Sequence, residues 1–184
     1  INFLNLGHLT QELAGNLSNS FEIEDTNDWF FKNALHELIS AFYNSNGGLH
    51  PKNSVESAFR SDFVVRLEKF WANYQYKHEF NPPHNHSGLY AFVVWMKIPY
   101  SSKEQKKLKF LDGMRDIDKK AGEFEFVYTN LLGDISNYRY PMSPELEGTI
   151  LLFPAQFMHC VYPFYDCDEP RISLSGNLMI SITN

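Results

Sequence analysis

The sequence has few of the features that mark disulfide-rich, zinc-binding or membrane-spanning proteins. Its two cysteines, Cys160 and Cys167, are not spaced as a CxxC pair, so a structural zinc site is not expected. They flank a predicted turn across which a disulfide would be feasible, but two isolated thiols in a cytosolic protein are the interpretation that we favour. No apolar run approaches the ~20 residues that a membrane-spanning helix needs.

An excess of basic residues is also missing. The formal net charge is −6 and the isoelectric point is about 5.6. Neither a nucleic acid nor an anionic membrane is therefore expected as a partner. No signal-peptide pattern stands at the start, which favours a cytoplasmic location, although a chain that begins with Ile1 rather than Met is expected to have an incomplete N-terminus.

The composition favours strands over long surface helices, because 16% of the residues are aromatic. A chain of 184 residues, 43% of them hydrophobic, suits a single domain spanning residues 1–184. Residues 1–60 carry helical cues: apolar residues recur at helical spacing from Trp29 to Phe42, and residues 51–60 are compatible with a further short helix.

The pattern changes to strands from about residue 61, and residues 61–184 are expected to form the β core. Turn residues separate apolar or alternating runs, which predict strands at 63–76, 89–99, 124–128, 136–140, 149–153, 160–164 and 172–182. Many short strands at regular spacing favour a sandwich, barrel or jelly roll. The charged segment at 101–122 is expected to be a loop or short helix over the sheet.

Two histidines in the segment Asn81–Gly88 suggest half of a metal site. Pro82 and Pro83 make the segment stiff and extended. His84 and His86 are two residues apart, so on a strand both imidazoles would lie on one face, with nitrogens able to sit about 2.1 Å from a metal. Such pairs also occur by chance on surfaces, and the pair alone does not define a site.

Further along the chain, His159 follows an apolar strand and a turn led by Pro154. A lone histidine in that setting is more often a hydrogen-bonded core residue. After the next turn, Arg171 begins an alternating strand that places Ser173 and Ser175 on the arginine's side. An arginine directed into a barrel needs an anion, and a carboxylate bound in the guanidinium fork is the natural candidate.

Three stretches together carry a resemblance to a known family: His-Asn-His at 84–86, Phe-Pro to His at 153–159, and Arg-Ile-Ser to Asn at 171–177. In order and spacing they resemble the iron(II)- and 2-oxoglutarate-dependent oxygenase superfamily. They are most similar to a group of oxygenases common in phage and marine bacterial sequences, in which a Trp-x-Asn such as 71–73 precedes the site. The resemblance covers about residues 61–184 and implies a double-stranded β-helix, or jelly roll, with N-terminal helices packed against it.

The resemblance also implies roles for individual residues. His84 and His159 would bind iron(II), and His86 would be the third ligand at a position where the superfamily usually has a carboxylate. A site of three histidines resembles those of cupins equally well. The cosubstrate 2-oxoglutarate would be bound by residues that follow or precede the metal motif, namely Arg171, Ser173, Asn73 and Tyr74. No catalytic residue is expected beyond the metal site.

The implied activity is hydroxylation, with dioxygen and 2-oxoglutarate as cosubstrates and either a protein side chain, such as prolyl, or a small molecule as substrate. Two alternatives stay open: a cupin-like three-histidine metal enzyme without 2-oxoglutarate, and a non-catalytic jelly-roll binding or structural module. Tyr90, Phe92 and Trp95 would line a dry pocket or simply fill the core. Exposed strand edges also suggest a homodimer.

Overall fold

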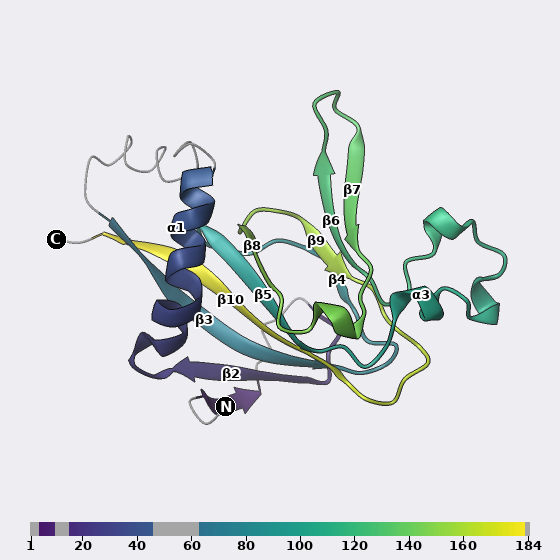
Figure 1. The fold of residues 1–184 in the computed structure, drawn as a ribbon, viewed down its shortest axis with the longest axis horizontal. Helices are drawn as coiled ribbons and strands as arrows, with labels where there is room; N and C mark the ends of the chain where they lie inside the picture. Colours follow the sequence, from purple (N-terminus) through teal and green to yellow (C-terminus); the bar gives the residue numbers. More distant parts are fainter. Residues whose placement is uncertain (1–3, 10–14, 46–62, 183–184) are drawn as a thin grey trace.

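The computed structural model describes residues 4–9, 15–45 and 63–182, and within them two antiparallel sheets dominate (Figure 1). The larger sheet has the strand order β1-β2-β3-β10-β5-β8. Its strands are β1 (Leu4–Leu9), β2 (Asn19–Asp25), β3 (Phe63–Gln75), β10 (Arg171–Ile182), β5 (Tyr90–Lys97) and β8 (Ile150–Pro154). The smaller sheet, in the order β4-β9-β6-β7, consists of β4 (Asn81–His84), β9 (His159–Val161), β6 (Phe124–Thr129) and β7 (Ile135–Tyr140).

The chain path confirms the predicted mostly β, jelly-roll fold. From β3 to β10, successive strands alternate between the larger and the smaller sheet, except at the hairpin of β6 and β7, both of which lie in the smaller sheet. This alternation is the winding of a double-stranded β-helix, in which two antiparallel sheets face each other. Each strand that the sequence predicts from residue 61 onwards corresponds to β3 or to one of β5–β10.

The N-terminal part differs from its prediction. The sequence predicts helical structure over residues 1–60, whereas β1 and β2 extend the larger sheet beyond β3. β2 has few apolar residues, and its strand conformation depends on backbone pairing with β3, such as Ser20 with Asn73, rather than on intrinsic propensity. The predicted short helix at 51–60 lies outside the described residues.

Helical structure does follow β2, as the sequence predicts. It consists of η1 (Thr26–Asp28), the π-helical turn η2 (Phe31–Leu35) and α1 (His36–Ser45). Both carboxylate oxygens of Asp25 accept hydrogen bonds from the backbone N–H groups of Phe30 and Phe31, at 2.7 and 2.9 Å, which fixes the start of this segment. α1 lies across the larger sheet on the face turned away from the smaller one (Figure 1).

Two apolar cores result from this layering. One lies between the helical segment and the larger sheet and contains Leu35, Phe70, Phe92, Leu174 and Leu178 among its buried residues. The other lies between the two sheets and contains Trp95, Phe124, Phe126, Phe153 and Phe164 among its buried residues. Since successive strand residues point to opposite faces, β3, β10, β5 and β8 divide their side chains between the helix-facing core and the space between the sheets.

The charged segment at 101–122 forms short helical turns joined by loops, as the sequence predicts. These are α3 (Ser102–Gln105), η3 (Lys109–Leu111) and η4 (Asp116–Asp118), and a further turn, η5 (Pro144–Leu146), precedes β8. Lys106 pairs with buried Glu123, and Lys120 pairs with buried Glu125 at 3.0 Å. These two ion pairs attach the segment to the smaller sheet.

The state of the two cysteines is as the sequence predicts. Cys160 and Cys167 are both free thiols, which confirms the favoured interpretation. Among the described residues, none of the helices has the length and apolarity that a bilayer-crossing helix requires.

The burial of Leu35 gives a direct test of the helix-facing core. Leu35 is 0% exposed, so Leu35→Ala should lower the free energy of unfolding by about 2–5 kcal/mol through lost transfer energy and the remaining cavity. Leu132 in the loop between β6 and β7 is 87% exposed, and Leu132→Ala should change the same quantity by no more than about 0.5 kcal/mol. Urea unfolding of both variants measures the difference, and equal effects would contradict the packing described.

Candidate metal centre

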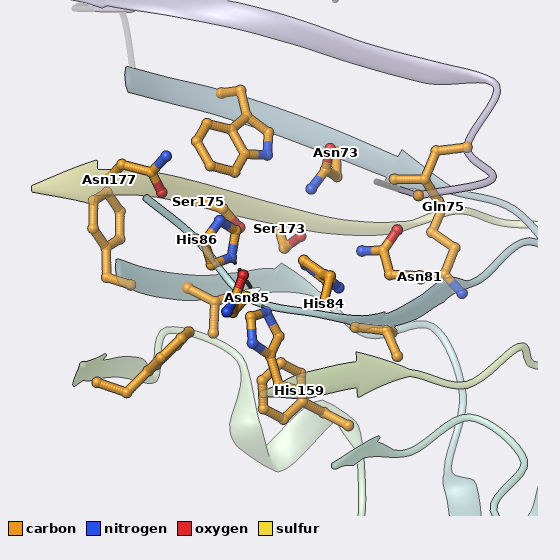
Figure 2. Close-up of a pocket in the computed structure, with 18 of the residues that line it drawn as sticks. Asn73, Gln75, Asn81, His84, Asn85, His86, His159, Ser173, Ser175 and Asn177 are labelled. Atoms are coloured by element: carbon orange, nitrogen blue, oxygen red, sulfur yellow. Dashed lines mark hydrogen bonds between the residues drawn. The ribbon is translucent and has the colours of Figure 1, made fainter. Parts of the chain in front are cut away.

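The three predicted histidines come together between the sheets at one end of the smaller sheet (Figure 2). His84 ends β4 and pairs across the strands with His159, the first residue of β9. His86 lies beyond the end of β4, and its backbone N–H donates a 2.8 Å hydrogen bond to the carbonyl oxygen of Ala155. That bond ties the loop after β4 to the turn before β9, which brings the third imidazole to the pair.

The distances within this cluster suit a shared metal ion. One ligand nitrogen from each imidazole lies within 4.8 Å of the others. Nε2 of His86 is 3.3 Å from Nε2 of His159. Two nitrogens bonded to one metal at ~2.1 Å lie about 3.0–3.4 Å apart for bond angles between 90° and tetrahedral, so this pair already has the spacing of neighbouring ligands.

Backbone contacts orient two of the rings. Nδ1–H of His84 donates to the carbonyl oxygen of Pro82 at 2.7 Å, and Nδ1–H of His159 donates to that of Phe157 at 3.0 Å. Because a carbonyl oxygen only accepts hydrogen bonds, each Nδ1 carries the proton, and each Nε2 keeps a lone pair. Such a contact behind the ligand atom fixes the tautomer and ring orientation of a metal-binding histidine.

Burial keeps all three imidazoles neutral near pH 7. It lowers the pKa of His86 from 6.5 to about 4 and that of His159 from 6.5 to about 3, with neighbouring imidazoles adding to the effect. The pKa of His84 is also lowered by burial, against an opposing effect of its bond to Pro82. Neutral imidazole is the metal-binding form, so little proton displacement is needed for binding at neutral pH.

A cavity of about 250 Å³ opens in front of the histidines. One wall is formed by residues of β3 and β10 that pair across the two strands: Gln75 with Arg171, Asn73 with Ser173, Trp71 with Ser175, and Lys69 with Asn177. Figure 2 shows the polar side chains of this wall facing the histidines. None of the described residues that line the cavity is an aspartate or a glutamate.

Arg171 lies at one end of this wall and is 5% exposed. It donates to the hydroxyl oxygen of Tyr100 at 2.9 Å and to Oε1 of Gln75. The Tyr100 hydroxyl in turn donates to the carbonyl oxygen of Gly122 at 2.9 Å. Among the described residues, no carboxylate forms an ion pair with Arg171. Both of these partners are neutral, so no carboxylate of the described residues pairs directly with the guanidinium.

The other residues that the sequence predicts fall on both sides of the sheet. Asn73 and Ser173 line the cavity with Arg171. Tyr74 does not: it points to the opposite face, where its ring meets that of Phe21 edge-on at 5.7 Å. Alternation along β3 requires this, because neighbours on a strand cannot share a face.

The aromatic residues that the sequence proposes as a lining divide in the same way. Trp95 lines the cavity, whereas Tyr90 and Phe92 lie in the helix-facing core, where Tyr90 meets Phe42 and Phe92 meets Phe70. The sequence prediction omits other residues at the site, namely Gln75, Asn81, Tyr100, Asn177, Gly15 and Leu17. Gln75 could have been predicted, because it follows Asn73 by two positions and strand alternation places both on one face. No local pattern indicates that Gly15, Leu17 or Tyr100 approaches the site.

The profile of a family described as "Putative 2OG-Fe(II) oxygenase" matches residues 69–177, which include the three histidines and Arg171. No curated protein sequence matches the chain significantly.

Solved structures with similar folds include an oxidoreductase of the 2OG-Fe(II) oxygenase family from Burkholderia pseudomallei (16% identity, TM-score 0.41, 68% of this chain and 49% of that chain). A Pseudomonas putida prolyl-4-hydroxylase is also similar (13% identity, TM-score 0.47, 96% of this chain and 77% of that chain). The chain thus spans about half the length of the Burkholderia protein.

The histidine cluster predicts selective loss of metal binding. His159→Ala should weaken cobalt(II) binding by about 100-fold or more, because it removes a ligand rather than a supporting contact. His36→Ala, on the exposed side of α1, should leave the affinity unchanged. The visible absorption of cobalt(II) titrated into each protein gives both dissociation constants, and equal affinities would exclude His159 as a ligand.

The lowered histidine pKa values predict how the stability of the metal-free protein depends on pH. Below pH 6.5 the unfolded chain takes up protons that His86, with a pKa of about 4 when folded, does not. The free energy of unfolding should therefore be highest above pH 6.5 and fall as the pH decreases towards 4. Urea unfolding across this range, compared with His86→Gln, isolates the effect: the variant should show a shallower decline, and parallel profiles would contradict the assignment.

Proposed function

The chain belongs to the family of 2OG-Fe(II) oxygenases, and on that premise we propose that it binds iron(II) through His84, His86 and His159 and uses 2-oxoglutarate and dioxygen to hydroxylate a further substrate. The observation that carries this proposal is the buried guanidinium of Arg171 at the end of the same cavity, which forms no ion pair with a carboxylate of the described residues. A cupin-like metal site without an acidic cosubstrate would have no general need for a buried arginine in its cavity.

Arg171 is suited to anchor the distal carboxylate of 2-oxoglutarate. Its guanidinium has five N–H donors, and Tyr100 and Gln75 hold it through NH1 and NH2. The donors that remain can bind a carboxylate in the fork geometry. A buried charge is costly without a counter-ion, so the binding of an anion here gains energy from relieving that cost.

The charge of the metal site supports the same cosubstrate. Three neutral imidazoles leave both positive charges of iron(II) without a protein counter-ion, and the described lining of the cavity contains no carboxylate. In the superfamily, the position of His86 usually carries one. A dianion such as 2-oxoglutarate would neutralise the metal at one end and Arg171 at the other, so iron and cosubstrate should each strengthen the binding of the other.

Iron(II) with 2-oxoglutarate supplies the chemistry, in which oxidative decarboxylation of the cosubstrate to succinate and carbon dioxide is coupled to insertion of one oxygen atom into a C–H bond. The chain supplies a dry and oriented site for it. The rings of Phe124 and Phe153 lie 5.5 and 5.1 Å from that of His159, and the ring of Trp71 lies 5.9 Å from that of His86. These apolar groups limit the access of water to the reacting atoms.

Ser173 and Asn73 are proposed to contact the cosubstrate between Arg171 and the metal, since both lie on the same wall of the cavity. The substrate, a protein side chain such as prolyl or a small molecule, stays a prediction from the sequence. So do the homodimer, the single domain and the association with phage or marine bacteria.

Anaerobic absorption spectroscopy tests the proposed function. Iron(II) and 2-oxoglutarate added together should produce the weak visible charge-transfer band of the chelate. His84→Ala should abolish the band, and Arg171→Ala should raise the 2-oxoglutarate concentration needed for it by about 30-fold or more, as expected for loss of a buried charged hydrogen-bond partner.

Arg115→Ala, which removes an exposed arginine far along the chain from the site, serves as the matched control and should leave the band unchanged. Absence of the band in the folded wild-type protein would count against 2-oxoglutarate as the cosubstrate and leave the cupin-like alternative.

A further inference from the structure

We propose that residues 15–20, which lie outside the part of the chain that matches the oxygenase family, form a wall of the cosubstrate half of the cavity, and that the Glu79 carboxylate holds this wall in place. Glu79 is then a positioning residue for 2-oxoglutarate, and Leu17 limits the length of the 2-oxo acid that fits. The inference rests on the proposed function, because it concerns the cosubstrate of that site.

The wall is fastened to the turn between β3 and β4. Oε1 of Glu79 accepts hydrogen bonds from both the backbone N–H of Ser18, at 2.9 Å, and the Ser18 hydroxyl. Oε2 of Glu79 accepts one from the backbone N–H of Tyr76 at 2.8 Å. A backbone bond from Asn16 to the carbonyl oxygen of Phe80, at 2.8 Å, forms an isolated antiparallel bridge beside these contacts.

The same residues reach the cavity and its polar side chains. Gly15 and Leu17 both line the cavity. Gly15 lies so close to Asn81 that a Cβ atom there would be 1.8 Å from Oδ1 of Asn81, and that oxygen is buried without a hydrogen-bond partner in the described structure. The buried hydroxyl of Ser20 donates to Oδ1 of Asn73 at 2.6 Å.

These contacts lie in the half of the cavity that contains Arg171. Nε2 of Gln75 donates to the backbone carbonyl of Glu79 at 2.6 Å, and Oε1 of Gln75 accepts a hydrogen bond from Arg171. Glu79 therefore links the wall on one side to the arginine on the other. Figure 2 shows Asn81 beside Gln75, at the end of the cavity away from Asn177.

Since Arg171 would hold the distal carboxylate of 2-oxoglutarate, the carbon chain of that acid would extend from this end towards the histidines. A wall placed here contacts the cosubstrate rather than the metal. Loosening it should therefore weaken 2-oxoglutarate binding and leave the affinity for the metal alone unchanged.

Variants of Glu79 test the fastening. Glu79→Ala should raise the dissociation constant of 2-oxoglutarate, measured with the iron(II)-loaded protein under anaerobic conditions, by about tenfold or more, the effect of losing one charged hydrogen bond. The dissociation constant of the metal alone should stay within about twofold, which also shows that the variant is folded. Glu79→Gln keeps an oxygen acceptor for the Ser18 amide but turns an NH2 donor towards the Tyr76 amide, so it should restore only part of the affinity. Glu24→Ala, an exposed carboxylate on β2, is the control and should behave as wild type.

A second variant tests the wall without altering the turn. Leu17→Ala should widen the cosubstrate half, so the affinity for 2-oxoglutarate should fall while that for 2-oxoadipate, longer by one methylene, should fall less or rise. The ratio of the two dissociation constants should move by about threefold or more in favour of the longer acid, as one methylene of buried contact permits. A general loss of structure would weaken both acids equally and would not shift this ratio.

The outcomes separate the two proposals. If wild-type protein binds 2-oxoglutarate and Arg171→Ala weakens it, but Glu79→Ala and Leu17→Ala change neither affinity nor selectivity, the wall is refuted while the proposed function stands. If wild-type protein with iron(II) binds no 2-oxoglutarate, the proposed function fails and the wall fails with it. A parallel loss of metal affinity in Glu79→Ala would also overturn the inference, since it would place the effect at the histidines.

Discussion

The position of β10 between β3 and β5 is the constraint on which the rest of the structure depends. β10 pairs along its length with β3 and over much of it with β5, so its register is fixed from both sides. Its alternating side chains direct Arg171 and Ser173 into the cavity and Leu174 and Leu178 into the helix-facing core. A slip of one residue would bury the arginine among leucines and open the apolar residues to the cavity. Between Asn177 and Leu178, the pairing with β3 skips Glu68, which is a β-bulge. The bulge shifts the alternation of β3 by one residue, so the apolar residues on both sides of Glu68 lie in the helix-facing core.

Much of the jelly roll was predictable because its strands carry the pattern in their own residues. The run Tyr90–Lys97 is almost wholly apolar and becomes a central strand, and the alternation after Arg171 gives the correct orientation of β10. β2 was not predictable in this way. Its alternation rests on little more than Phe21 and Ile23, and pairing with a strand some fifty residues further along the chain decides its conformation.

Some residues of the candidate site could likewise be predicted from the sequence, and others could not. His84, His86 and Arg171 were identifiable from short motifs, because each motif reflects a local backbone geometry. Tyr100 and Gln75, which hold the arginine, come from segments that only the fold brings together. Tyr74 was assigned to the cosubstrate as the neighbour of Asn73, and strand alternation, a rule available from the sequence, would have placed it on the far face.

The histidines and the arginine belong to different sheets. His84 and His159 lie on β4 and β9 of the smaller sheet, whereas Arg171 begins a strand of the larger one. A cosubstrate bound at both ends would therefore act as a non-covalent cross-link between the two halves of the jelly roll. Unfolding that separates the sheets would have to break it, so occupancy of the site would add to global stability by mass action. The resistance of the protein to heat and proteolysis would then increase with the local concentration of 2-oxoglutarate.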